Sequence, residues 1–252
     1  MDNLTMTKNA RRPLLIRIGK YLRPVFNRIL AHYSLFPNEP VLDPYDLPWV
    51  KSLEQHGPQI RQEWERLNQE RDVAPPLKEI SPDHARIADD QRWKSFFLYG
   101  YGFRVAENCA KAPFTAALAS RIPNLNSAFF SILDPGAEIP PHFGVTKGLL
   151  TCHLGVSVPR KREECWINVD GQKIEWENDR CILFDDTYEH WVKNNTDEQR
   201  VVLLIQILRP ERSVGKLLQK LFMTAIRKSA FVKDARKNFS RWSAAHNQME
   251  RI

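Results

Sequence analysis

The chain has 252 residues, 42% of them hydrophobic, and a formal net charge of +7. A chain of this length can bury one substantial core with appendages, or at most two small domains. No apolar run approaches the roughly 18 residues that a membrane-spanning helix needs, so we expect none. The first nine residues are polar and lack the apolar core of a secretory signal, which makes a cytoplasmic protein the expectation.

The charge is divided unevenly along the chain. Residues 1–37 carry seven Lys/Arg against one acidic residue, and residues 209–252 carry eleven against three. The ends therefore hold +6 and +8, which leaves −7 for the middle, 38–208. Because attraction for anionic surfaces belongs to the ends alone, we predict three parts: a basic amphipathic segment over 1–37, a folded domain over 38–210 and a basic helical segment over 211–252.

The four cysteines predict reduced thiols. They show no Cys-x-x-Cys spacing, and four in a chain of this length do not form a disulfide scaffold. Cys152 and Cys181 lie in strand-like runs that would bury them.

The first third of the chain has helical patterns. Apolar and basic residues alternate every third or fourth position over 11–23, which predicts one or two short amphipathic helices that Pro24 breaks or kinks. Four prolines over 36–49 predict an extended or turning stretch. The pattern over 48–71 indicates a helix on the outside of the core, with a break at Gly57-Pro58.

From Trp93 onward the hydrophobic period changes to that of strands. An Ala-rich helix over 108–122 interrupts the series, and Asp170-Gly171 predicts a hairpin. Short strands separated by turns indicate a sandwich or a double-sheet jelly roll. The predicted strands, apart from the second arm of the hairpin, cover residues 96–101, 128–133, 148–158, 165–169, 180–184 and 200–208.

Beyond Pro210 the pattern becomes helical again. Over 213–223, Val214, Leu217, Leu218, Leu221 and Phe222 share one helical face, with Lys216 and Lys220 opposite. Two interpretations stay open for both basic ends. They dock on the core, or they make a peripheral contact with an anionic membrane, to which each Lys/Arg contributes roughly 1 kcal/mol.

Two histidines carry the main functional signal. His142 lies in Pro-Pro-His-Phe-Gly, and His190 ends Phe-Asp-Asp-Thr-Tyr-Glu-His, with Arg200 ten residues later. Two histidines and an arginine in this layout are typical of non-haem Fe(II) oxygenases, where the arginine binds an anionic co-substrate. The usual third ligand is a carboxylate two residues after the first histidine, and here that position is Gly144.

Further motifs in the same order resemble the aspartyl/asparaginyl β-hydroxylase family, which includes bacterial lipid A hydroxylase-like members. The resemblance covers roughly residues 36–210. The matching motifs are Trp93-Lys94, Asn108-Cys109 with Pro113, the segment 131–136, the segment 141–144, His153-Leu-Gly155, the segment 184–190 and Arg200.

The resemblance implies a mainly β protein, a double-stranded β-helix (jelly roll, cupin-like) with flanking α-helices. It also implies an enzyme that uses Fe(II), O₂ and 2-oxoglutarate to hydroxylate an unactivated C–H bond. By position, His142 and His190 match the metal ligands, and Arg200, Ser131 and His153 match the residues that bind 2-oxoglutarate.

The resemblance also bears on the substrate. Members of the aspartyl type have His-x-Gly, with water in place of the carboxylate, and Asp186 would orient that water as part of the catalytic group. Some lipid A hydroxylase-like members have His-x-Asp instead. The family's substrate-binding arginines correspond here to Leu149 and Thr151, so an anionic substrate would need Lys147, Lys94 or Arg104 as a substitute.

Several functions are therefore weighed. The leading one is hydroxylation of an aspartyl/asparaginyl-type residue, free, in a peptide or on a carrier protein. The alternatives are hydroxylation of a lipid acyl chain at a membrane surface and a catalytically weak jelly-roll binding module. Nucleic acid is disfavoured as a partner, because the central region is acidic and carries no recognised nucleic-acid-binding motif.

Overall fold

The structure is a computed structural model that describes residues 14–70, 73–80, 91–229 and 232–238, with side chains from Arg23 onward. No helix in these ranges is both long and apolar enough to cross a membrane. The named helices are α1 (Leu14–Tyr33), α2 (Val50–Gln55), α3 (Gly57–Leu67), α4 (Leu77–Ile80), α5 (Ala106–Lys111), α6 (Pro113–Ser120) and α7 (Ser213–Lys228). The strands are β1 (Val41–Leu42), β2 (Trp93–Gly100), β3 (Phe103–Arg104), β4 (Leu125–Leu133), β5 (Glu138–His142), β6 (Leu149–Ser157), β7 (Cys165–Val169), β8 (Gln172–Glu175), β9 (Cys181–Phe184), β10 (His190–Asn194) and β11 (Arg200–Leu208).

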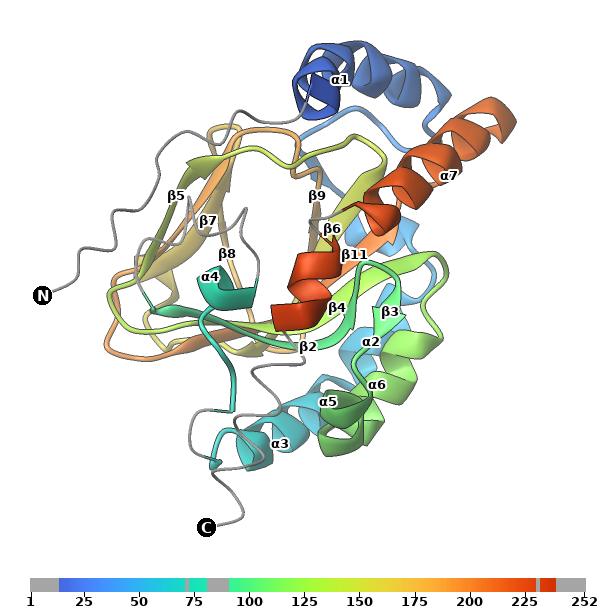
Figure 1. The fold of residues 1–252 in the computed structure, drawn as a ribbon. Helices are drawn as coiled ribbons and strands as arrows, with labels where there is room; N and C mark the ends of the chain where they lie inside the picture. The colour runs from blue at the N-terminus through green and yellow to red at the C-terminus, as the bar shows by residue number, and fades with distance from the viewer. Residues whose placement is uncertain (1–13, 71–72, 81–90, 230–231, 239–252) are drawn as a thin grey trace, which may run out of the picture.

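The strands form two antiparallel sheets that face each other (Figure 1). The seven-stranded sheet has the order β1-β9-β6-β11-β4-β2-β3, and the four-stranded sheet has the order β5-β10-β7-β8. The apolar layer between them includes Phe97, Phe129, Ile167 and Val192, all buried. This arrangement confirms the predicted mainly β jelly roll with flanking helices.

A second apolar cluster lies on the other face of the seven-stranded sheet. There Ile60 and Trp64 of α3 pack with Phe130 of β4, and α2, α5 and α6 complete the cover (Figure 1). The predicted break at Gly57-Pro58 is confirmed, since α2 ends at Gln55 and α3 begins at Gly57. The single helix predicted over 108–122 is wrong. It is divided into α5 and α6 at Ala112, which takes a non-helical conformation before Pro113.

The two basic ends pack on each other. α1 is longer than the predicted helix and continues through Pro24 without ending, although residues 11–13 of the predicted segment lie outside the described residues. Phe26 of α1 packs on Phe222 of α7, with ring centroids 4.4 Å apart. Whether residues 1–37, 38–210 and 211–252 form separate units stays a prediction.

Four strands were not predicted, namely β1, β3, β5 and β10. β5 contains Pro140 and Pro141, which disfavour a strand in a sequence pattern, but it lies at the edge of its sheet, where a missing N–H is tolerated. All four cysteines are buried and unpaired, as expected of reduced thiols.

Glu211, just before α7, is a buried acid without a hydrogen-bond partner among the described residues. Its side chain is 1% exposed, and both carboxylate oxygens are unpaired there. Desolvation raises its pKa from 4.5 to about 7, against the opposing influence of Arg209. The folded protein therefore binds more protons than the unfolded chain between these two values, so this group lowers stability as the pH rises through that window.

Glu211→Gln should remove this pH dependence. Near pH 4 the native carboxyl is protonated, so variant and wild type should unfold with nearly equal free energy, whereas near pH 8 the variant should be more stable by about 1–3 kcal/mol. Urea unfolding at both pH values measures the difference. A constant difference at the two pH values would contradict the assignment.

Candidate functional site

The two predicted metal-ligand histidines are brought face to face by the four-stranded sheet. His142 ends β5 and His190 begins β10, and they are direct cross-strand partners. Their ring centroids lie 4.0 Å apart. Residues 48 positions apart in the chain thus converge because neighbouring antiparallel strands place paired side chains on the same face.

Hydrogen bonds fix how each ring is presented. The Nδ1 atom of His142 lies 2.9 Å from the carbonyl oxygen of Pro140, and that of His190 lies 2.9 Å from the carbonyl oxygen of Tyr188. A carbonyl oxygen only accepts, so each Nδ1 carries the proton and each Nε2 keeps its lone pair for a metal ion.

The surroundings of the two rings also favour the neutral form that binds metal. Burial and then the neighbouring His190 lower the pKa of His142 to about 4, and burial lowers the pKa of His190. The described residues contain no cluster of three or more His, Cys, Asp or Glu suited to a metal ion. The donor set is therefore two imidazoles, and it fits a metal ion whose other positions are filled by solvent or by a bound molecule.

Asp186 occupies the space that a side chain at position 144 would need. A Cβ atom added to Gly144 would lie 2.0 Å from Oδ1 of Asp186, far inside any real contact. The backbone N–H of Gly144 also donates to the backbone carbonyl of Asp186. The glycine two residues after His142 is thus required by the position of Asp186.

Neutral donors hold Asp186 from the seven-stranded sheet. Its Oδ2 accepts from Oγ1 of Thr151 at 3.1 Å and from Nε2 of Gln206 at 3.2 Å. Burial, and then the charge of Asp185, raise the pKa of Asp186 to about 7, while Thr151, Gln206 and Arg23 act in the opposite direction. The carboxyl can therefore change protonation state near neutral pH.

A second polar cluster, on β4, β6 and β11, surrounds a buried arginine. Arg200 is 1% exposed, and its Nη1 donates to the carbonyl oxygen of Ser131 at 3.2 Å. Its guanidinium lies 4.7 Å from the ring centroid of Trp176. No ion pair found within the described ranges includes Arg200, and its Nε has no hydrogen-bond partner there. Desolvation lowers its pKa from 12.5 to about 10.

His153 adds an unused donor to this cluster. Trp176 donates its Nε1–H to Nδ1 of His153 at 3.4 Å, so the proton of the neutral ring is on Nε2. That Nε2 is buried and has no partner among the described residues. Burial and the charge of Arg200 keep the pKa of His153 well below its usual value. A guanidinium without a carboxylate partner among the described residues, beside an N–H without an acceptor there, suits an anion.

Ser131, His153 and Arg200 are called the anion cluster below. The anion cluster and the histidine pair belong to one site. Phe184 packs against His153 at 5.0 Å and against His190 at 5.8 Å between ring centroids. Every predicted site residue is thus brought together: His142, His190, Asp186, Ser131, His153 and Arg200. Three residues that sequence reasoning missed also contribute, namely Trp176, Gln206 and Arg23, whose guanidinium donates to the carbonyl oxygen of Gly144.

The three cations suggested as substitutes for the missing arginines have other roles. Lys147 pairs with Asp185 at 2.8 Å, and Lys94 pairs with Asp134 at 2.7 Å. Arg104 lies on β3, the edge strand of the seven-stranded sheet. There its charge acts to lower the pKa of Tyr99 and of Cys109, against the effect of burial. Thr151 faces Asp186, and Leu149 is buried.

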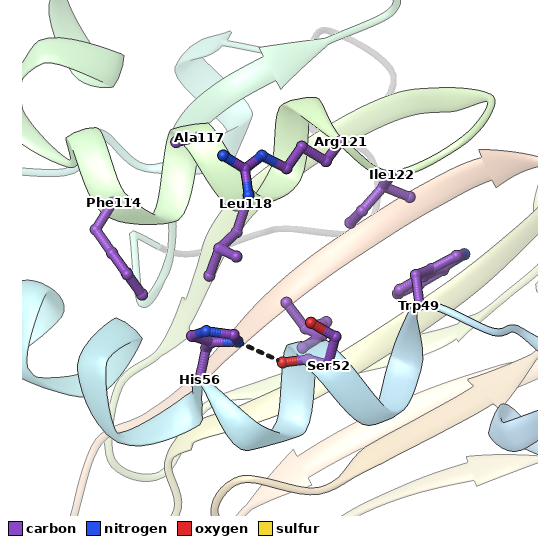
Figure 2. Close-up of a pocket in the computed structure, with 9 residues that line it drawn as sticks. Trp49, Ser52, His56, Phe114, Ala117, Leu118, Arg121 and Ile122 are labelled. Atoms are coloured by element: carbon purple, nitrogen blue, oxygen red, sulfur yellow. Dashed lines mark hydrogen bonds between the residues drawn. The ribbon is translucent and has the colours of Figure 1, made fainter.

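A groove of about 280 Å³ lies elsewhere, between α2 and α6 (Figure 2). Its lining includes Trp49, His56, Phe114 and Arg121, and His56 hydrogen-bonds the carbonyl oxygen of Ser52 at 2.6 Å. None of the predicted site residues lines it, so the groove is separate from the histidine pair.

Sequence comparison agrees with this geometry. The profile of the aspartyl/asparaginyl β-hydroxylase family matches residues 54–210, which contain both histidines, Asp186 and the buried arginine. The chain belongs to the aspartyl/asparaginyl β-hydroxylase family. It is thereby related to hydroxylases, and the predicted family membership is confirmed.

Individual family members differ in how much of them the chain covers. An ornithine lipid ester-linked acyl 2-hydroxylase of Rhizobium tropici is 36% identical over 210 residues, which are 83% of this chain and 75% of that relative. The human aspartyl/asparaginyl β-hydroxylase is 30% identical over 167 residues, covering 64% of this chain and only 21% of the human protein. Among solved structures, the cupin domain of Schizosaccharomyces pombe Cnp3 aligns with a TM-score of 0.32 and 13% identity, over 47% of this chain and 66% of that one.

Proposed function

We propose that this member of the aspartyl/asparaginyl β-hydroxylase family is an Fe(II)- and 2-oxoglutarate-dependent dioxygenase that hydroxylates the acyl chain of a lipid. The observation that supports 2-oxoglutarate as co-substrate is Arg200, a buried guanidinium without a carboxylate partner among the described residues. Burying an unpaired charge is costly. A dicarboxylate would offset that cost by pairing one carboxylate with Arg200, and its 2-oxo acid end would be left for a metal ion at the histidine pair.

Each residue then has a role that follows from its contacts. Arg200 and the Nε2–H of His153 bind the far carboxylate, and Ser131 positions Arg200. The Nε2 atoms of His142 and His190 would hold Fe(II), which would supply the activation of O₂ for attack on an unactivated C–H bond. Asp186, held by Thr151 and Gln206, orients solvent in the place of the missing carboxylate ligand.

The rim of the site favours an apolar substrate. Phe143 and Val145, on either side of Gly144, are 56% and 57% exposed. The positions where the family often has arginines, 149 and 151, offer a buried leucine and a threonine engaged with Asp186. The relative from Rhizobium tropici, named for ester-linked acyl hydroxylation, is matched over 83% of this chain. An aspartyl/asparaginyl residue is the second candidate, supported by Gly144 and by the human relative.

His142→Ala should abolish turnover and weaken Fe(II) binding by more than about 100-fold, since even loss of a hydrogen-bond partner to a metal ligand costs 10- to 100-fold. The assay measures succinate formed from 2-oxoglutarate with Fe(II), and Fe(II) affinity separately. His56→Ala is the matched control, because His56 lies in the groove between α2 and α6. Wild-type protein that binds Fe(II) and 2-oxoglutarate but forms no succinate would support a binding module instead.

Mass spectrometry of the products tests which class of substrate is hydroxylated. Detergent-dispersed acyl lipids and Asp- or Asn-containing peptides are incubated with the iron-loaded enzyme, and products are examined for a gain of one oxygen. Hydroxylation of lipid alone supports the proposal. Hydroxylation of peptide alone would replace the lipid substrate with an aspartyl/asparaginyl residue.

A further inference from the structure

One face of α7 is buried against the protein, and a nearly opposite face carries exposed apolar side chains. Gly215, Gln219 and Met223 face the body of the protein and are buried. Val214, Leu217 and Leu221 lie on another face at helical spacing, and the two leucines are each 60% exposed. These three belong to the apolar helical face predicted from the sequence, and they are exposed rather than docked on the core. A surface helix ordinarily exposes its polar face, so the stripe needs a partner.

α1 presents a similar stripe beside it. Val25 and Ile29, one helical turn apart, are both exposed. Phe26, three residues before Ile29, packs on Phe222 of α7. Because residues three and four apart are neighbours on a helix, the exposed residues of α1 lie next to its contact with α7. Together the two stripes border the seam between the helices.

This helix pair is fastened to the rim of the candidate site. Arg23 of α1 donates to the carbonyl oxygen of Gly144, and the N–H of Lys147 donates to Oδ1 of Asn27 at 3.0 Å. On the side of α7, Gln219 donates to the carbonyl oxygen of Gly148 at 2.8 Å. Exposed Phe143 and Val145 lie in the loop that these bonds hold, between His142 and β6.

The charge around the apolar residues has one sign. Residues 14–33, 143–148 and 212–229 contain no Asp or Glu. Arg28, Lys216 and Lys220 are exposed, and the two lysines are one turn apart on α7. Exposed leucines flanked by lysines fit the boundary between anionic headgroups and acyl chains, where apolar burial and electrostatic attraction add.

We infer that α1, α7 and the loop 143–147 form a docking surface for an anionic lipid bilayer, which brings the rim of the metal site to the membrane. This surface comprises Val25, Arg28, Ile29, Phe143, Val145, Val214, Lys216, Leu217, Lys220 and Leu221. The biological purpose of this docking surface rests on the proposed function, since an enzyme that hydroxylates acyl chains must meet them at a membrane. The binding itself is independent of catalysis.

Co-flotation of the full chain with vesicles tests the surface. Wild-type protein should float with phosphatidylcholine vesicles containing phosphatidylglycerol and bind pure phosphatidylcholine far less. Lys216→Gln/Lys220→Gln should reduce binding to the anionic vesicles about 25-fold, from roughly fivefold for each lysine. Leu217→Ser/Leu221→Ser should reduce it roughly tenfold or more. The matched controls, Lys51→Gln and Phe114→Ser, change an exposed lysine of α2 and an exposed phenylalanine of α6 and should bind as wild type.

Labelling tests the same surface without removing its side chains. The native cysteines are all buried, so an environment-sensitive dye can be attached through Leu217→Cys, with Arg121→Cys as the control. The dye at 217 should shift to the blue with phosphatidylglycerol vesicles, and the dye at 121 should not. No flotation by wild type, or equal shifts at both positions, would overturn the proposal.

Failure of docking and failure of the proposed function are distinguishable. If the lysine variant loses vesicle binding but still forms succinate with detergent-dispersed lipid, both inferences stand. If the wild-type protein binds vesicles but forms no succinate with any substrate, the docking surface is supported and the proposed function is overturned. If turnover occurs without docking, the surface alone is overturned.

Discussion

Arg200→Met should make the ligand-free protein more stable while removing its use of 2-oxoglutarate. Arg200 is buried without a carboxylate partner in the described part of the chain, and methionine fills similar space without a charge. Replacing buried charges by apolar groups can stabilise a protein by about 1–4 kcal/mol, and we expect about 1–3 kcal/mol here. Losing two charge-assisted hydrogen bonds to the co-substrate should raise its KM about 100-fold or more.

Arg209→Met is the matched control, because Arg209 is equally buried but fully partnered. Its guanidinium bonds Asp185, Ser34 and the carbonyl oxygen of Pro37. Removing one partner of a buried ion pair costs about 3–5 kcal/mol, so this variant should be destabilised. Chemical unfolding without 2-oxoglutarate gives both free energies, and succinate formation gives KM. A destabilised Arg200→Met with an unchanged KM would contradict an anion site at Arg200.

Gly144→Ala should lower turnover by about 100-fold although it adds only one methyl group. The new Cβ would lie 2.0 Å from Oδ1 of Asp186, so either the carboxyl or the loop after His142 must move. A displacement of about 1 Å at a site of this kind can cost 100-fold in rate. Overpacking adds a stability cost of about 1–3 kcal/mol.

Gly171 provides the control glycine. It lies at φ +84° in the hairpin turn, with nothing within 4 Å of an added Cβ, and asparagine tolerates that conformation. Gly171→Asn should leave succinate formation unchanged. Combining Gly144→Ala with Asp186→Gly removes the clash with the carboxyl but leaves the added Cβ 2.9 Å from the backbone oxygen of residue 186, so it should not restore full turnover. Wild-type turnover in Gly144→Ala would show that the Asp186 carboxyl need not stay where it is.

The residues of the anion cluster were predicted from the family resemblance, and the strands that carry them were predicted from the sequence pattern. Ser131, His153 and Arg200 belong to β4, β6 and β11, and each of these runs was recognised from its β-rich composition. Their neighbours were not predictable. Trp176 directly follows the second strand of the hairpin and belongs to no recognised motif, although it bonds His153. Arg23 bonds Gly144, which lies 121 residues away in the chain. Such contacts depend on how distant elements pack, which local pattern does not encode.

The strands that carry the histidines could not be predicted, although the histidines themselves could. β5 reads Glu-Ile-Pro-Pro-His, and β10 follows a polar turn. Their pairing comes from the sheet, not from local propensity. Similarly, α1 passes through Pro24, where propensity alone predicts a break or kink, and Phe26, two residues after the proline, packs against Phe222 of α7.

The histidine pair and the anion cluster belong to different sheets. His142 and His190 lie in the four-stranded sheet, while Ser131, His153 and Arg200 lie in the seven-stranded one. Facing sheets pack about 10 Å apart, at a separation set by the side chains between them. In the proposed function, a dicarboxylate that bridges iron and Arg200 would have to match the thickness of that apolar layer. Buried residues of the layer such as Phe129 and Ile167 would then help to determine which length of dicarboxylate fits.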